Sequence, residues 1–261
     1  MSTSGMVYIV GAGPGDPELI TVRGQRLLAE AEVILYADSL VPRQMLSVAR
    51  ADAEIIQTAN KTLEEILPLM VARVQAGKSV VRLHSGDPSL YGAVHEQMQA
   101  LAQAQIPFEV IPGISAFQAA AASLKVELTV PGLVQTIILT RISGRTQVPE
   151  GEELAALAAH RASLCLYLSA RHVEDAQAKL LTAYEPDTPV AICFRLGWPD
   201  EQIWTVPLSE MASTTQQQEL IRTTLYLISP ALKLEPGHSA ARSRLYSPDH
   251  SHLFRPRAGS H

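Results

Sequence analysis

The chain has 261 residues, 47% of them hydrophobic and 18% charged, and it carries a formal net charge of −5 at pH 7. This length allows one or two domains with ample cores, and the composition is that of an ordinary soluble globular protein. The acidic balance argues against a general nucleic-acid binder, and the lack of a long apolar run argues against a membrane span.

Cysteine usage indicates a reducing compartment. Cys165 and Cys193 both lie in apolar runs, which favours reduced thiols in a core over a disulfide. The first residues lack the basic-then-apolar order of a signal peptide. We therefore predict a cytoplasmic protein.

The first predicted element is a short buried strand that runs into a glycine-rich turn. Residues 6–17 read Met-Val-Tyr-Ile-Val-Gly-Ala-Gly-Pro-Gly-Asp-Pro. Gly11, Gly13 and Gly15 allow another molecule to approach the backbone, and Pro14 keeps the turn stiff. A turn of this kind at the end of a strand is where open α/β sheets hold ligands. A helix free of proline should follow it.

Two common nucleotide-binding loops do not fit this turn. In the dinucleotide-binding fingerprint G-x-G-x-x-G, the third glycine would stand where this chain has Asp16, and Pro14 removes a backbone donor that a pyrophosphate needs. No G-x-x-x-x-G-K sequence occurs, which excludes a P-loop. Taken alone, the turn could equally be a tight connection without a ligand.

The rest of the first half alternates strands and helices. Strands are predicted at 33–36, 54–57, 79–83 and 108–111, and helices from Thr62, at 93–104 and at 115–123. Thr62 and Glu65 have the spacing of a capping box. Pro68 inside that helix is expected to bend or delay it.

The pattern restarts in the second half. Strands are predicted at 136–139, 164–168, 190–194 and 224–228, an antiparallel edge strand at 202–206, and helices at 153–160 and 173–184. The alternation predicts an α/β protein with two α/β domains, residues 1–122 and 123–232. Apolar content falls over 233–261, where we expect an irregular tail.

Two more turns resemble the first in composition and position. Residues 82–92 read Arg-Leu-His-Ser-Gly-Asp-Pro-Ser-Leu-Tyr-Gly, and residues 111–116 read Ile-Pro-Gly-Ile-Ser-Ala. Each follows a predicted strand, so the three turns should lie on one rim of one sheet. Asp87 could hold a ligand ammonium or ribose, or it could accept hydrogen bonds from its own turn.

Together, the motifs at 10–17, 85–92 and 112–116 resemble those of the tetrapyrrole methylase family. Members of this family transfer methyl groups from S-adenosylmethionine to ring carbons of corrin and sirohaem precursors. Stretches 36–41, 139–146 and 194–201 resemble the branch that converts precorrin-4 to precorrin-5 at C(11) in cobalamin biosynthesis, although Leu196 replaces a residue that is usually small. Cobalt-precorrin-4, another ring position and uroporphyrinogen III stay open as alternative substrates.

The resemblance implies a class III methyltransferase-like fold, with two α/β/α domains and a cleft between them. It also implies a homodimer. We expect no bound metal ion, no membrane association and no nucleic-acid partner. The cofactor would be S-adenosylmethionine, released as S-adenosylhomocysteine. The implied cofactor contacts are Pro14, Ser85, Gly86, Asp87, Leu90, Ser115, Ala116, Leu168, Leu196, Thr224 and Leu225.

Methyl transfer from a sulfonium demands mainly alignment and exclusion of water. The sequence contains no His–Asp pair with a spacing that would identify a general base. Asp38 and His84 are the candidates, and each has a structural alternative, as a turn carboxylate and as a packed residue at a strand end.

The substrate would carry a rim of acetate and propionate carboxylates, which arginine forks grip well. Arg141 and Arg145 in a Ser-Gly turn are the first candidates, and the others are Arg195, Lys61, Arg82 and Arg43. The alternative for each is an ordinary surface charge.

Two other function classes stay open. One is a regulator that binds the cofactor without catalysing a reaction. The presence of predicted binding residues for both cofactor and substrate counts against it. The other is a nicotinamide oxidoreductase, which the missing third glycine counts against.

Overall fold

The computed structural model describes residues 5–144 and 146–233. Within these residues the chain forms two compact units. The first unit runs to Ser123 and adds Phe194–Gln202, and the second contains Leu124–Cys193 and the chain from Ile203. Sequence patterns gave no sign that 194–202 packs with the N-terminal half.

The first unit is built on a five-stranded sheet in the order β3-β2-β4-β1-β5. Every strand pair recorded in it is parallel. The strands are β1 (Val7–Gly11), β2 (Val33–Tyr36), β3 (Glu54–Gln57), β4 (Val80–His84) and β5 (Phe108–Ile111). The helices are α1 (Val22–Glu30), α2 (Leu63–Gln75), α3 (Val94–Gln103) and α4 (Ala116–Leu124), with short 3-10 helices at Pro17–Leu19 and Arg43–Val48.

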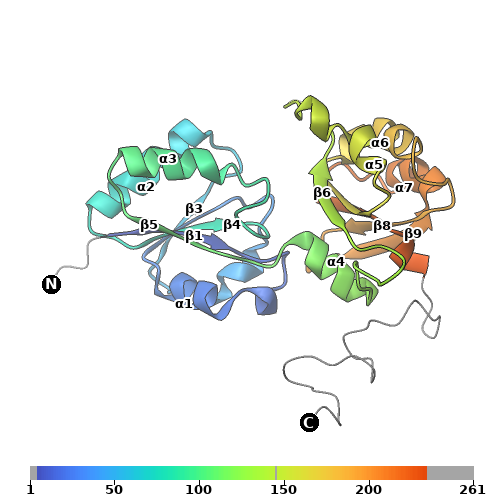
Figure 1. Ribbon diagram of the computed structural model, residues 1–261. Coiled ribbons are helices and arrows are strands. Elements are labelled where there is room, and N and C mark those ends of the chain that lie inside the picture. Colours follow the sequence, from blue (N-terminus) through green and yellow to red (C-terminus); the bar gives the residue numbers. More distant parts are fainter. Residues whose placement is uncertain (1–4, 145, 234–261) are drawn as a thin grey trace, which may run out of the picture. The chain divides into compact units, whose positions relative to one another are not determined.

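Helices cover both faces of this sheet, with α2 and α3 on one face and α1 on the other (Figure 1). Alternation along β1 sorts its side chains between the faces: Val7 and Ile9 join the core under α2 and α3, and Val10 joins the core under α1. Because helices cover both faces of a parallel sheet, its strands need apolar residues on both faces. The β-branched runs therefore predicted the strands correctly.

The capping box at the start of α2 is confirmed. The Thr62 N–H donates to the Glu65 carboxylate at 2.7 Å, and the helix begins at the next residue. Pro68 lies inside the helix, which is continuous from Leu63 to Gln75. The expected delay at the proline does not occur.

The second unit holds a mixed sheet in the order β6-β7-β10-β8-β9. Its strands are β6 (Ile137–Arg141), β7 (Ser163–Tyr167), β8 (Pro189–Phe194), β9 (Gln202–Pro207) and β10 (Thr224–Ile228). Strands β6 and β7 pair in parallel, whereas β7 and β10 pair antiparallel. Helices α5 (Leu154–Ala158), α6 (Val173–Leu180) and α7 (Met211–Gln217) lie on one face (Figure 1). The α/β fold class is confirmed, and β9 is an edge strand as predicted.

Both cysteines are buried and neither is part of a disulfide, as predicted. Burial, reinforced by the neighbouring Cys193, raises the pKa of the Cys165 thiol to about 12. The thiol is therefore protonated at neutral pH and unreactive. None of the helices in the described part of the chain has the length and apolar character that a membrane crossing needs. The predicted tail at 233–261 lies outside the described residues except for Lys233.

Candidate functional site

The three glycine-containing turns meet at one edge of the first sheet, as predicted. Strands β4, β1 and β5 are neighbours, so their carboxyl ends lie side by side. Gly13 and Gly86 exchange two backbone hydrogen bonds, with N···O distances of 3.2 and 2.8 Å. The Ala12 N–H also donates to the His84 carbonyl at 2.7 Å. The first two turns are therefore held together through their backbones.

The third turn packs against the other two so closely that no side chain fits. A Cβ added at Gly113 would lie 2.3 Å from the Gly86 oxygen and 2.8 Å from the Gly11 Cα. One added at Gly11 would lie 2.7 Å from the Gly113 backbone. These glycines are required by backbone contact between turns, independently of any ligand.

Asp87 fastens the second turn to the third. Its Oδ1 accepts from the Ser89 N–H at 2.8 Å and from the Ser89 hydroxyl, and its Oδ2 accepts from the Gly113 N–H at 2.9 Å. Partial burial acts to raise the pKa of Asp87, but the hydrogen bonds from Ser89 and Gly113 prevail and lower it. The carboxylate is thus used within the rim, which agrees with the structural alternative for this residue.

Replacing Asp87 with alanine should destabilise the protein by about 1–3 kcal/mol, because two amides lose their acceptor. Denaturant unfolding measures this loss. Since the pKa of Asp87 is lowered in the folded state, its contribution is present above the unfolded-state pKa and is lost as pH falls through the folded-state pKa. The wild-type protein should therefore lose more stability in acid than Asp87→Ala does. Equal acid sensitivity of the two proteins would contradict the assignment.

Among the glycines of the three turns, Gly86 has the most space around its Cα. This glycine has φ +64°, and an added Cβ would have nothing nearer than the Ser115 Cα at 3.8 Å. Ser85 is exposed, Leu90 is half-buried, and Pro14 and Ser115 are buried. Ala116 is the first residue of α4. A ligand can therefore approach the backbone at Gly86, whereas the rest of the rim is closely packed.

Predicted cofactor residues of the second unit lie at strand ends. Leu168 directly follows β7 with φ 54° and is 67% exposed. It was predicted inside the strand, which instead ends at Tyr167 because the backbone turns into the left-handed region. Thr224 and Leu225 begin β10 and are buried. Leu196 is buried in the 194–202 segment, which packs with the first unit.

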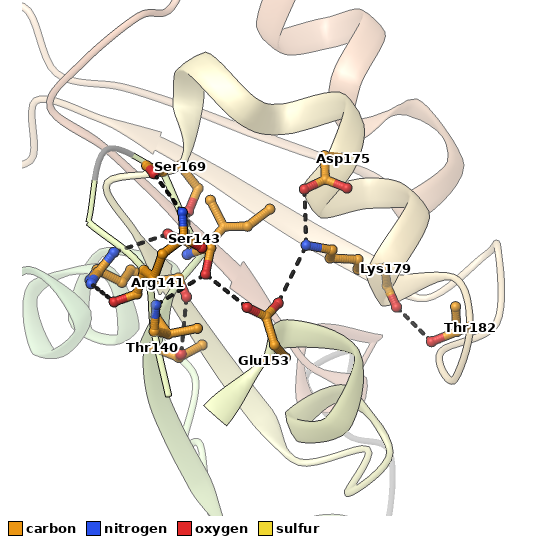
Figure 2. A network of polar contacts seen from close by, with 12 residues as sticks. Thr140, Arg141, Ser143, Glu153, Ser169, Asp175, Lys179 and Thr182 are labelled. Carbon is orange, nitrogen blue, oxygen red and sulfur yellow. Dashed lines mark hydrogen bonds and ion pairs between the residues drawn. The ribbon is translucent and has the colours of Figure 1, made fainter. Parts of the chain in front are cut away.

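The guanidinium of Arg141 binds its own loop. It donates to the carbonyls of Ile142, Thr146 and Gln147 at 3.2, 2.8 and 3.1 Å. Figure 2 shows this network, which continues from Ser143 to Glu153 and from Glu153 to Lys179. The fork is therefore occupied by loop carbonyls, a structural role. Arg145, the second predicted arginine of this turn, lies outside the described residues.

Arg195 is also engaged. Its guanidinium lies over the Trp198 ring, 4.0 Å from the centroid, and pairs with the Asp200 carboxylate. Arg82, by contrast, is 7% exposed and has no carboxylate partner in the described part of the chain. Its Nη1 donates to the Thr58 hydroxyl at 3.0 Å and its Nε to the Gln97 side chain at 3.3 Å.

Burial lowers the pKa of Arg82 to about 10. The cation is therefore held in a poorly solvated position, with no compensating anion among the residues that the structure describes. Lys61 lies beside the same threonine, since its N–H donates to the Thr58 carbonyl at 3.1 Å. No hydrogen bond or ion pair is recorded for the Lys61 ammonium in the part of the chain that the structure describes, and the residue is half-buried. Sequence alone cannot show that Arg82 lacks a carboxylate partner among the described residues, because such partners depend on tertiary packing.

Neither candidate base has the properties of one. Burial, with a further effect of Arg82, lowers the pKa of His84 to about 3, so this imidazole is neutral and a weak base. Its Nε2 is enclosed and has no hydrogen-bond partner in the described residues. Asp38, in the loop after β2, is exposed and accepts from the N–H of Ala59 in the loop after β3 at 3.2 Å. No group of His, Cys, Asp and Glu suited to a metal ion occurs among the described residues.

Comparisons with known proteins identify a family and several similar proteins. A model of the family described as Tetrapyrrole (Corrin/Porphyrin) Methylases matches residues 6–212. A precorrin-4 C(11)-methyltransferase of Pseudomonas aeruginosa is 45% identical over 96% of this chain and 98% of its own length. The crystal structure of a cobalamin biosynthetic enzyme, cobalt precorrin-4 methyltransferase, is 41% identical with a TM-score of 0.84, covering 88% of this chain and 96% of its own.

A uroporphyrin-III C-methyl transferase from Thermus thermophilus, solved in complex with S-adenosylhomocysteine, is also similar. It is 30% identical with a TM-score of 0.74, covering 88% of this chain and 99% of its own.

Proposed function

The chain belongs to the tetrapyrrole (corrin/porphyrin) methylase family, and we propose that it methylates precorrin-4 at C(11), giving precorrin-5 in cobalamin biosynthesis. The observation that carries this proposal is the similarity to the Pseudomonas relative, which extends over nearly the whole of both chains. Cobalt-precorrin-4 is the second candidate, because the enzyme of that name has almost the same identity to this chain.

The family uses S-adenosylmethionine, and the space around the Gly86 Cα supports a cofactor contact there. Ser85, next to Gly86 in sequence, is exposed, and Leu90 is half-buried. We propose that these residues, with Pro14, Asp87, Ser115 and Ala116, hold the cofactor, and that Leu168, Leu196, Thr224 and Leu225 complete the site. When bound, the cofactor supplies a methyl group already activated on sulfur.

The protein's part in the reaction is then to bind, orient and exclude water. Holding two reactants in line can lower a barrier by about 7–11 kcal/mol. The interlocked turns suit this task, because backbone contacts and Asp87 leave the rim little freedom to move. We assign no general base, since His84 is buried and weakly basic and Asp38 is bonded to Ala59.

Two cations with no carboxylate partner recorded among the described residues support a proposal for the binding of the substrate carboxylates. Arg141 and Arg195 have their guanidinium groups engaged. Arg82 donates to the Thr58 hydroxyl and the Lys61 backbone N–H donates to the Thr58 carbonyl, and no carboxylate partner is recorded for either side chain among the described residues. We propose that Lys61 and Arg82 receive an acetate or propionate group of the substrate. Arg141, Arg145 and Arg195 are then secondary candidates for the same rim of carboxylates.

A labelling experiment tests the reaction. The protein is incubated with S-adenosylmethionine carrying a ¹³C-methyl group, together with metal-free precorrin-4 or with its cobalt complex. Carbon NMR of the product should place the label at C(11), and the faster reaction identifies the natural form of the substrate. Label at another ring carbon, or none with either form, would refute the proposal.

The family resemblance also leads us to propose a homodimer in the cytoplasm. Sedimentation equilibrium should give about twice the chain mass of 28.3 kDa. A mass equal to that of one chain at micromolar concentration would exclude the dimer.

A further inference from the structure

The 194–202 segment contains an aromatic side chain, Trp198, that the proposed reaction does not use. The strands on either side, β8 and β9, belong to the second sheet, yet the segment packs with the first unit. Trp198 is its largest side chain. The backbone N–H of Trp198 donates to the Arg195 carbonyl at 2.9 Å, and the backbone N–H of Glu201 donates to the Trp198 carbonyl at 3.0 Å. These two bonds make the segment a compact turn.

The indole of Trp198 lies directly on the first glycine turn. A Cβ added at Gly15 would be 2.4 Å from its Cδ1 and 2.8 Å from its Nε1. Next to it, a Cβ added at Gly197 would be 2.6 Å from the Asp16 nitrogen. The backbone of the first turn, the backbone at Gly197 and the Trp198 ring are therefore packed so closely that no further methyl group fits. Gly15 is also held through its carbonyl, which accepts from the Gln44 side chain at 3.0 Å.

Other residues of the segment hold the Trp198 indole in place. The Arg195 guanidinium stacks on the indole and is held by Asp200, and the Gly197 N–H donates to the Glu201 carboxylate at 2.6 Å. The indole Nε1, however, is enclosed and has no hydrogen-bond partner among the described residues. An enclosed donor without an acceptor is unfavourable. The contribution of the ring must therefore come from its shape and stacking.

We propose that Trp198 is a positioning residue for the cofactor: its ring holds Pro14, Gly15 and Asp16 in the conformation that receives S-adenosylmethionine, and Arg195 holds the ring. This inference rests on the proposed function in one respect, namely that the first turn forms part of the cofactor site.

Calorimetry with S-adenosylhomocysteine on the full chain tests the proposal. Trp198→Ala should weaken binding by at least about tenfold, since small displacements of binding groups are costly. Trp198→Phe keeps a stacking ring and removes the unpaired donor, so it should restore most of the affinity without lowering the melting temperature. Trp204→Phe, which changes the other tryptophan of the chain on β9, is the matched control and should bind like wild type.

Fluorescence gives a second measurement that needs no alanine variant. In the Trp204→Phe protein, Trp198 is the sole tryptophan, and its emission should change on titration with S-adenosylhomocysteine. Wild-type affinity in folded Trp198→Ala, or unchanged emission during saturation, would overturn the positioning role while leaving the cofactor proposal intact. If the wild-type protein does not bind S-adenosylhomocysteine, both proposals are wrong.

Discussion

Replacing Gly113 with alanine is expected to abolish binding of S-adenosylhomocysteine and to destabilise the protein by about 1–3 kcal/mol or more, the usual cost of forcing a methyl group into a packed site. The new Cβ would lie 2.3 Å from the Gly86 oxygen and within 3.0 Å of the Gly11 backbone. Because these neighbours are backbone atoms, relief requires the second and third turns to separate. Calorimetry and denaturant unfolding measure the two effects.

Gly151 provides the matched control for this substitution. It lies in the second unit, and a Cβ added there would have no heavy atom within 4 Å. Gly151→Ala should therefore leave both affinity and stability at wild-type values. If Gly113→Ala also binds S-adenosylhomocysteine normally, the close packing of the three turns is not needed for the cofactor site.

The strands of this protein could be predicted because local sequence determines them. Runs such as Val33–Tyr36 and Thr224–Ile228 are rich in β-branched, leucine and aromatic residues, and both were predicted with the observed bounds. Turns after successive strands could be predicted to converge because parallel strands end on the same edge. Helix ends were harder: α6 stops at Leu180, four residues before the predicted end, although the apolar spacing continues to Tyr184.

The partners of polar side chains could not be predicted in the same way. Asp87 bonds to Gly113, twenty-six residues later, and Trp198 packs on Gly15 from the other half of the chain. Such contacts depend on tertiary packing that no local spacing encodes. The same limitation affected the cations: Arg141 is suited to carboxylates by residue type, yet three carbonyls of its own loop occupy its fork. Whether an arginine is available for a ligand is a property of the fold.

Arg82 gives the second large expected effect. Arg82→Met should raise the Michaelis constant for the tetrapyrrole by about 10- to 100-fold, because a charge-assisted hydrogen bond to a ligand contributes about 1.5–3 kcal/mol. Stability should change little, since the lost bonds to Thr58 and Gln97 are offset by removing a buried, unpaired cation. Affinity for S-adenosylhomocysteine should stay at the wild-type value. Steady-state kinetics with parallel calorimetry and unfolding measure all three quantities.

Controls on other cations separate a substrate contact from a general effect of charge. Arg23→Met removes an exposed arginine that pairs with Glu109 and should leave the Michaelis constant unchanged. Lys61→Ala should raise it, and added salt should reduce the difference between Lys61→Ala and wild type, because salt screens exposed charges most strongly. Arg141→Ala should act mainly on stability, since its loop loses a donor to three carbonyls. A Michaelis constant that rises in Arg141→Ala but not in Arg82→Met would place the carboxylate site in the second unit instead.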